Sequence, residues 1–368
     1  MDGDARPLPR VLPGLTSLRF FAAMWVVVYH YVWWLPGGED RPIPLISSGH
    51  LGVGFFFVLS GFILTHAHYG QITDRRLAVR PFLTKRIAKI YPMHLATLLF
   101  YVALIGAVRV AGLELPNQDR YTVPQLLMNL FLVHGWQVQD AGAWNYPSWS
   151  ISAEWFAYLL FPLVLAPVLI RRTRAVAAPW LVLASLGFFG ASVLLSPVVF
   201  GVSYFGLHSN FGYVHIVPEF VLGMALYRLA RERELPWLAA RPVLPALVVT
   251  AALFALLEQD FLVTLVLALT ILTCAERHRH NRDDVMAHAG LVYLGEISFS
   301  LYMVHVPVAT LLLQGARLAL GSTPLWAVLL AVPVAVMAAG VAYRLIEKPS
   351  HRFVLRFSRG RRAQPQFG

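Results

Sequence analysis

Two ionisable residues lie in an apolar stretch near the start of the chain. Arg19 and His30 both fall within LTSLRFFAAMWVVVYHY, which runs from Leu15 to Tyr31. Eleven residues of α-helix advance about 16 Å and rotate about 1100°, so the two side chains lie only about 20° apart on one face. An ionisable residue inside a membrane is costly, so its presence indicates function. The spacing suits a long anionic substrate whose charged end lies on Arg19 and whose reactive end reaches His30.

A carboxylate lies in the segment PSWSISAEW, which starts at Pro147. Ser150, Glu154 and Tyr158 are spaced four residues apart and form one polar stripe on an apolar helix. We expect His30 to be the partner of Glu154, because a carboxylate raises the basicity of an imidazole and fixes its tautomer. The alternative is that Glu154 pairs with a structural donor.

A cationic pair opens another apolar run. Arg86 and Lys89 are one helical turn apart and share a face. Together with Arg19 they would form a grip for phosphates at one side of the membrane. The alternative is that both are interfacial residues whose long side chains reach to the membrane surface.

Ser298, Tyr302 and His305 form a further polar stripe, because their spacing places them on one helix face. His305 is interpreted either as a substrate-lining histidine or as a hydrogen-bonded structural residue, and the structural role is preferred.

The run GHLGVGFFFVLSGFILT contains several small residues. Small residues let helix backbones approach closely, and this packing role is predicted for Gly52, Gly54, Ser60 and Gly61. The two histidines at the end of the run, His66 and His68, are interpreted as surface residues.

Composition excludes a soluble globular protein, because 58% of the 368 residues are hydrophobic and only 13% are charged. The formal net charge is +11, but the basic residues cluster between apolar runs. This pattern is typical of loops that face the cytoplasm rather than of nucleic-acid binding. The single cysteine, Cys274, excludes a disulfide framework, and no metal site is predicted.

The predicted fold is an all-α integral membrane protein with about ten transmembrane helices and both termini in the cytoplasm. The apolar runs are 15–35, 46–67, 87–110, 121–137, 148–170, 178–198, 211–229, 243–258, 260–276, 288–314 and 324–346. The basic loops agree with the positive-inside rule only if one run does not span. The run 121–137 is the shortest and most polar, so it is predicted to be re-entrant or interfacial. The predicted divisions are a cytoplasmic segment 1–14, one membrane domain 15–353 and a basic tail 354–368.

Seven motifs together resemble acyltransferase family 3. They are LTSLRFFAAMWVVVYH, GHLGVGFFFVLSGFIL, KRIAKIYPMH, WSISAEWFAY, PEFVLGMALYR, ISFSLYMVHVPV and RLIEKPSHRF, and they span residues 13 to 353. Family members are polytopic bacterial membrane enzymes that O-acylate sugars and natural products. The resemblance implies that His30 is catalytic and Arg19 essential. Two positions depart from the family pattern, since Lys89 replaces an arginine and Gly54 replaces the aspartate of many members.

The resemblance implies a multi-pass protein of the bacterial inner membrane, in contact with the lipid bilayer. Acyl-coenzyme A is the expected donor, with its phosphates on the cationic grip, and no permanently bound cofactor is expected. His30 would act as general base on an acceptor hydroxyl, with Ser150, Tyr302 or His305 as donors to the oxyanion. Direct transfer and an acyl-histidine intermediate both remain open.

The favoured acceptor is a macrolide-type antibiotic, because the compact chain resembles the stand-alone members that acylate such compounds. The alternative acceptor is a cell-surface polysaccharide. A transporter or flippase without covalent chemistry is the rival class. Against it, no pair of similarly broken segments suggests an inverted repeat.

Overall fold

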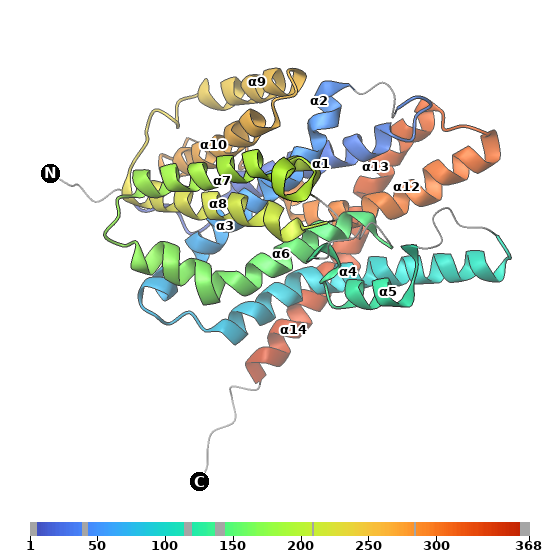
Figure 1. Ribbon diagram of the computed structural model, residues 1–368, viewed down its shortest axis with the longest axis horizontal. Helices are drawn as coiled ribbons and strands as arrows, with labels where there is room; N and C mark the ends of the chain where they lie inside the picture. Colours follow the sequence, from blue (N-terminus) through green and yellow to red (C-terminus); the bar gives the residue numbers. More distant parts are fainter. Residues whose placement is uncertain are drawn as a thin grey trace, which may run out of the picture.

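The protein is helical, and no strand occurs in residues 6–38, 43–113, 120–136, 144–207, 210–282 and 285–360, which the computed structural model describes. The helices run largely along the long axis of the molecule (Figure 1). They are α1 (Pro13–Val32), α2 (Pro44–Ser47), α3 (Leu51–Thr73), α4 (Val79–Val110), α5 (Val123–Leu130), α6 (Trp149–Leu160), α7 (Ala178–Phe200), α8 (Gly212–Glu232), α9 (Val243–Leu256), α10 (Asp260–Arg279), α11 (Ala289–Glu296), α12 (Ser298–Leu320), α13 (Leu325–Ala342) and α14 (Lys348–Gly360).

Eight helical stretches in the described ranges are long and apolar enough to cross a membrane. They are Pro13–Val32, Pro44–Thr73, Val79–Val110, Tyr146–Arg172, Ala178–Phe200, Asp260–Arg279, Ser298–Leu320 and Leu325–Val354. The predicted all-α, multi-pass fold is confirmed at this level. The other two predicted spans correspond to α8, which carries buried charged residues, and α9, whose 14 residues advance only about 21 Å.

The run that was predicted not to span contains α5, a helix of eight residues. Eight residues advance about 12 Å, which is less than half of the roughly 30 Å hydrocarbon core. The helix packs through Leu126 and Leu130 against the outer part of α4, near Tyr101 and Ile105. The end of the predicted run, Gln137, lies outside the described residues.

The last helix extends beyond the last predicted apolar run, which ends at residue 346. Helix α13 continues through a π-helical turn, Tyr343–Glu347, directly into α14. A π-turn inserts one extra residue without ending the helix, and Pro349 is tolerated because it lies in the first turn of the next segment. Residues 354–360 of the predicted basic tail are therefore helical.

Helix α3 lies at the centre of the molecule and packs most extensively against α8. Their backbones meet at two glycines. A Cβ atom at Gly61 would lie 2.0 Å from the Phe220 carbonyl oxygen, and one at Gly223 would lie 1.9 Å from the Val58 carbonyl oxygen. The packing role predicted for Gly61 is confirmed, because only glycine permits this approach.

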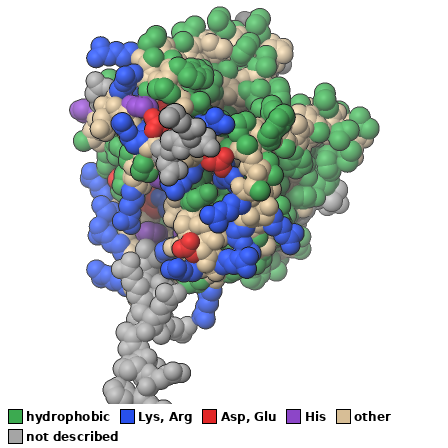
Figure 2. Space-filling model, turned by 90° about the vertical axis from the view of Figure 1, so that its left-hand side faces the viewer, with side chains coloured by type: hydrophobic (Ala, Val, Ile, Leu, Met, Phe, Trp, Pro, Cys, Tyr) green, Lys and Arg blue, Asp and Glu red, His purple; other side chains and the backbone are tan. Residues whose placement is uncertain are grey.

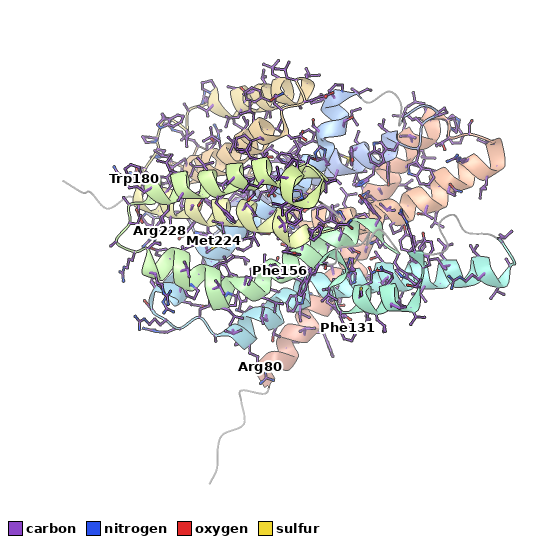
Figure 3. All side chains as sticks on the ribbon, viewed as in Figure 1. Arg80, Phe131, Phe156, Trp180, Met224 and Arg228 are labelled. Atoms are coloured by element: carbon purple, nitrogen blue, oxygen red, sulfur yellow. The ribbon has the colours of Figure 1, made fainter. Side chains whose placement is uncertain are left out.

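Basic side chains gather at one end of the molecule. Figure 2 shows this end, the left-hand side of Figure 1, covered by Lys and Arg side chains beside an apolar flank. Several exposed arginines lie in the connections between helices, either between α3 and α4 or between α6 and α7. They are Arg75, Arg76, Arg171, Arg172 and Arg174. Figure 3 places Arg228 of α8 and Trp180 of α7 at the same end, as expected for antiparallel neighbours.

We expect Gly223→Ala to destabilise the protein, because the new methyl group would force α3 and α8 apart. Overpacking of this kind costs about 1–3 kcal/mol. Thermal unfolding of the purified protein in detergent measures the effect. Gly187→Ala in α7 is the matched control, since no atom lies within 4 Å of its Cβ position, and it should be neutral or slightly stabilising. Equal melting temperatures for both variants would contradict the close approach.

Candidate active site

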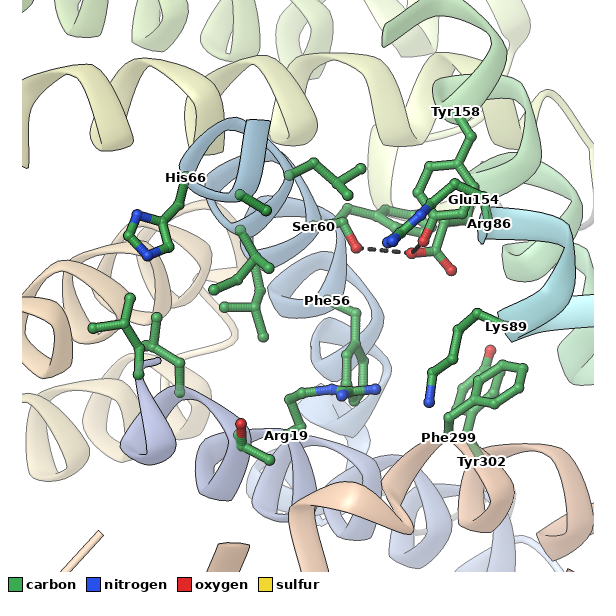
Figure 4. Close-up of a pocket in the computed structure, with 18 of the residues that line it drawn as sticks. Arg19, Phe56, Ser60, His66, Arg86, Lys89, Glu154, Tyr158, Phe299 and Tyr302 are labelled. Atoms are coloured by element: carbon green, nitrogen blue, oxygen red, sulfur yellow. Dashed lines mark hydrogen bonds between the residues drawn. The ribbon is translucent and has the colours of Figure 1, made fainter. Parts of the chain in front are cut away.

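A cavity of about 360 Å³ opens between α1, α3, α4, α6 and α12 (Figure 4). This volume is within the range of small-molecule sites. Seven of the nine predicted site residues line it, namely Arg19, Arg86, Lys89, Ser150, Glu154, Tyr158 and Tyr302. His30 and His305 are not among the lining residues. Packing of α1, α4 and α6 thus brings Arg19, the Arg86–Lys89 pair and the polar stripe of α6 to one cavity.

Glu154 is hydrogen-bonded inside the cavity. Its Oε1 atom accepts a hydrogen bond from Ser60 Oγ at 2.7 Å and another from the Tyr158 hydroxyl at 2.5 Å. The prediction that His30 is the partner of Glu154 is wrong. The donors come instead from α3 and from the next turn of α6, which corresponds to the alternative of structural donors. Ser60, interpreted from sequence as a packing residue, is therefore part of the site.

Arg86 lies beside Glu154 and Tyr158 (Figure 4). Its guanidinium carbon lies 5.8 Å from the ring centres of both Tyr158 and Phe82, as in cation–π contacts. Its Nε atom is buried and has no hydrogen-bond partner in the described part of the chain. The two rings hold the guanidinium in place without neutralising its charge, so Arg86 can bind an anion.

Lys89 forms an ion pair that the sequence did not indicate. Its Nζ atom contacts Glu347 Oε1, and Glu347 Oε2 accepts a hydrogen bond from Ser300 Oγ at 2.6 Å. The Lys89 side chain is 32% exposed, whereas that of Glu347 is 3% exposed. Lys89 does face the cavity, as predicted, but its charge is balanced by a carboxylate from the π-turn after α13.

The wall of the cavity near α12 is closed by two hydroxyl groups. Ser150 Oγ lies 2.7 Å from the Tyr302 hydroxyl oxygen, and both lie near the Pro147 carbonyl, at 3.1 Å and 2.9 Å. Three hydrogen-bond contacts thus share only two hydroxyl protons. Each proton points either to the Pro147 carbonyl or to the other hydroxyl oxygen. Neither Ser150 nor Tyr302 has a proton left for an oxyanion in this arrangement, although both were predicted as candidate donors.

His30 and His305 form a pair outside the cavity lining. His305 Nε2 lies 3.1 Å from His30 Nδ1. The Nδ1 atom of His305 lies 2.6 Å from the Tyr302 carbonyl oxygen, and that of His30 lies 3.0 Å from the Val26 carbonyl oxygen. Carbonyl oxygens only accept hydrogen bonds, so both Nδ1 atoms carry the proton in the neutral rings. The one Nδ1 proton of His30 is then shared between two acceptors, the Val26 carbonyl oxygen and His305 Nε2. In this neutral tautomer the lone pair of His30 is on Nε2.

This pairing bears on the two interpretations of His305. The residue is completely buried, and its backbone carbonyl accepts a hydrogen bond from the Tyr31 hydroxyl at 2.8 Å. In this arrangement it is hydrogen-bonded and lies outside the cavity lining. Its contact with His30 nevertheless gives it a role in the site, because the partner of one ring nitrogen sets the tautomer and orientation of the other.

Two histidines interpreted as surface residues are placed differently by the structure. His68 is only 7% exposed and packs edge-on against Phe82. His66 lines the cavity, and its Nε2 atom lies 3.1 Å from the Pro9 carbonyl oxygen. Their apolar neighbours come from segments distant in sequence, so no local pattern could have indicated this burial.

The glycine at position 54 also has a spatial explanation. A Cβ atom there would lie 2.9 Å from Oε1 of Glu219, a completely buried carboxylate of α8. His215 Nε2 lies 3.5 Å from the same oxygen. A carboxylate from α8 thus occupies the space where an aspartate at position 54 would place its own. An aspartate at position 54 in this chain would therefore bring two carboxylates together in a buried place.

We expect Lys89→Ala to destabilise the fold, because it leaves the carboxylate of Glu347 buried without a counter-ion. Breaking a buried pair costs about 3–5 kcal/mol, and the partial exposure of Lys89 reduces this to about 2–3 kcal/mol. The double variant Lys89→Met with Glu347→Gln should recover most of the loss. Unfolding in detergent measures each, with the exposed Lys85→Ala as control. An additive loss in the double variant would show that the pair contributes nothing.

Comparisons with known proteins identify the family of this chain. The acyltransferase domain model matches residues 12–344. Acyltransferase MdmB of Streptomyces mycarofaciens is 30% identical over 384 aligned residues, which cover 94% of each chain. A putative O-acetyltransferase of Staphylococcus aureus strain COL is 24% identical over 92% of this chain. O-acetyltransferase OatA of Staphylococcus aureus strain NCTC 8325 is 24% identical over 93% of it.

The chain spans only 57% of the length of each of these two staphylococcal relatives. No solved structure matches it. The match of the domain model over residues 12–344, together with the likeness to MdmB over 94% of both chains, shows that this chain belongs to acyltransferase family 3, a family of membrane O-acyltransferases.

Proposed function

We propose that this protein transfers an acyl group from acyl-coenzyme A to a hydroxyl group of a natural product, with a macrolide-type antibiotic as the favoured acceptor. The observation that carries this proposal is the convergence of Arg19, Arg86 and Lys89 on one cavity. The wall of that cavity is formed by Tyr302, whose carbonyl oxygen lies next to the histidine pair.

The donor follows from the charge and shape of the cavity. Guanidinium groups bind phosphate oxygens through charge-assisted hydrogen bonds, and the charge of Arg86 is not neutralised by its aromatic neighbours. A thioester that carries phosphates at one end and an acyl group at the other matches a cavity with cations along its length and a histidine pair past its wall. Glu154 and its two hydroxyl donors line the same space and contribute polar contacts to the donor or the acceptor.

The mechanism assigns the chemical step to His30. Its Nε2 lone pair takes the proton from the acceptor hydroxyl, and the oxygen attacks the thioester carbonyl. The carbon–sulfur bond then breaks, and the thiolate of coenzyme A takes the proton back from His30 Nε2. The Val26 carbonyl and His305 both accept from His30 Nδ1 and so hold the ring in place, which makes His305 a positioning residue. The wall at Ser150 and Tyr302 must open for the thioester to reach His30.

The choice of acceptor rests on sequence similarity. This chain is 30% identical to MdmB, against 24% for the relatives named as O-acetyltransferases. This favours the natural-product members of the family. A cell-surface polysaccharide is the second candidate, supported by the O-acetyltransferase relatives at 24% identity.

We expect purified wild-type protein to release free thiol from acyl-coenzyme A in the presence of acceptor. A transporter without covalent chemistry would release none. His30→Ala should lower turnover at least about 100-fold, the usual contribution of a positioned base. His288→Ser is the control, because position 288 is exposed and a serine can still cap α11. Near-normal turnover in His30→Ala, with an unchanged melting temperature, would remove His30 from the mechanism.

The proposed membrane arrangement has ten spans in the bacterial cell membrane, with both termini in the cytoplasm. Cysteines introduced at Asn117 and at Asp140, which both lie outside the described residues, should therefore react with an impermeant thiol reagent from outside. A cysteine introduced at Arg76, in the loop between α3 and α4, should react only after the membrane is permeabilised. The native Cys274 is buried and should not contribute. If the cysteine at position 117 were labelled only in permeabilised vesicles, this topology would be wrong.

A further inference from the structure

The segment before α1 is held against the membrane domain along residues 6–12. The Arg6 backbone N–H donates to Glu234 Oε1 at 2.5 Å, and this hydrogen bond holds the pKa of Glu234 below its ordinary value. The Pro9 carbonyl contacts His66 Nε2, and Leu12 is only 5% exposed within the core. This part of the predicted N-terminal segment is thus a docked strap with fixed neighbours rather than a free tail.

The strap contributes a cation to the rim of the cavity. Arg10, Val11 and Leu12 line the same cavity as Arg19 and Tyr302. Arg10 is exposed, and the preceding residue, Pro9, contacts His66. Figure 4 places His66 at one end of the cavity, Arg19 in the middle, and Lys89 with Tyr302 at the other end. Arg10 therefore lies at the end that is farthest from the histidine pair.

Charge along the cavity is unevenly balanced. Lys89 is paired with Glu347, and Arg86 lies beside Glu154. Within the described ranges, no carboxylate lies within ion-pair distance of Arg10 or Arg19. The cavity lining, with Glu347 included, has four cationic side chains against two carboxylates. The excess positive charge is therefore greatest at the rim and in the middle of the cavity.

We propose that Arg10 binds the ribose phosphate of the acyl-coenzyme A donor at the mouth of the cavity. This inference rests on the proposed function. Coenzyme A has two anionic places, a diphosphate next to the pantetheine arm and a phosphate on the ribose at its far end. When the thioester lies toward Tyr302, the diphosphate reaches Arg19 and Arg86. The ribose phosphate is then the group that extends to the rim, where Arg10 is the available cation.

A pair of donors isolates this contact, since acyl-dephospho-coenzyme A lacks only the ribose phosphate. Michaelis constants for both donors are measured with the full-length protein in nanodiscs, using thiol release. Arg10→Gln should raise the constant for acyl-coenzyme A about 3- to 10-fold, a value between those of an exposed ion pair and a charge-assisted hydrogen bond. The constant for acyl-dephospho-coenzyme A should stay within about twofold, because the group that Arg10 contacts is already absent from it.

Two variants serve as controls. Arg6→Gln changes an exposed side chain of the same strap that does not line the cavity, and its backbone bond to Glu234 stays intact. Both Michaelis constants should stay at the wild-type values in this variant. Arg10→Lys keeps the charge and should retain most of the preference for the phosphorylated donor. Added salt should reduce this preference, because the rim is open to solvent.

The results separate this inference from the function on which it rests. If wild-type protein releases thiol from acyl-coenzyme A but Arg10→Gln weakens both donors equally, or neither, Arg10 does not bind the ribose phosphate and the proposed function stands. If wild-type protein releases no thiol from acyl-coenzyme A, the donor assignment fails and the role of Arg10 falls with it.

Discussion

The cost of placing charge inside an apolar helical bundle determines where the ionisable residues of this protein lie. Away from the cavity, two buried arginines are matched by carboxylates one turn away, Arg279 by Glu276 and Arg228 by Glu232. Removing either partner of such a pair leaves a charge without compensation in a medium of low dielectric constant. At the cavity the lining residues include more cations than carboxylates. This surplus of positive charge is the electrostatic basis of the proposed donor site.

A second feature is the link between the cavity and the histidine pair. Tyr302 belongs to both, since its hydroxyl closes the cavity wall and its carbonyl accepts from His305. One turn of α12 thus joins the cavity wall to the histidine pair. A displacement of Tyr302 would move the carbonyl that orients His305, and with it the contact between His305 and His30.

Helix periodicity explains why much of the site could be predicted from the sequence. Arg86 shares a face with Lys89, and Ser150 shares one with Glu154, through spacing alone, so their convergence needed only local geometry. Contacts between distant segments were not accessible in this way. Lys89 and Glu347 are 258 residues apart, and His30 and His305 are 275 residues apart. Sequence spacing shows which residues share a face, but only tertiary packing decides which faces meet.

The backbone contact of α3 with α8 has a mechanical consequence. Because no side chain separates Gly61 and Gly223 from the opposite backbone, the two helices interlock and cannot slide along each other without a clash. Sliding of α3 along α8 therefore cannot widen the cavity on the side that carries Ser60. The same kind of contact ties α1 to α3, because a Cβ atom at Gly52 would lie 2.6 Å from the Ala22 carbonyl oxygen. Three helices, α1, α3 and α8, are thus locked together at their backbones, and the helix that carries His30 is one of them.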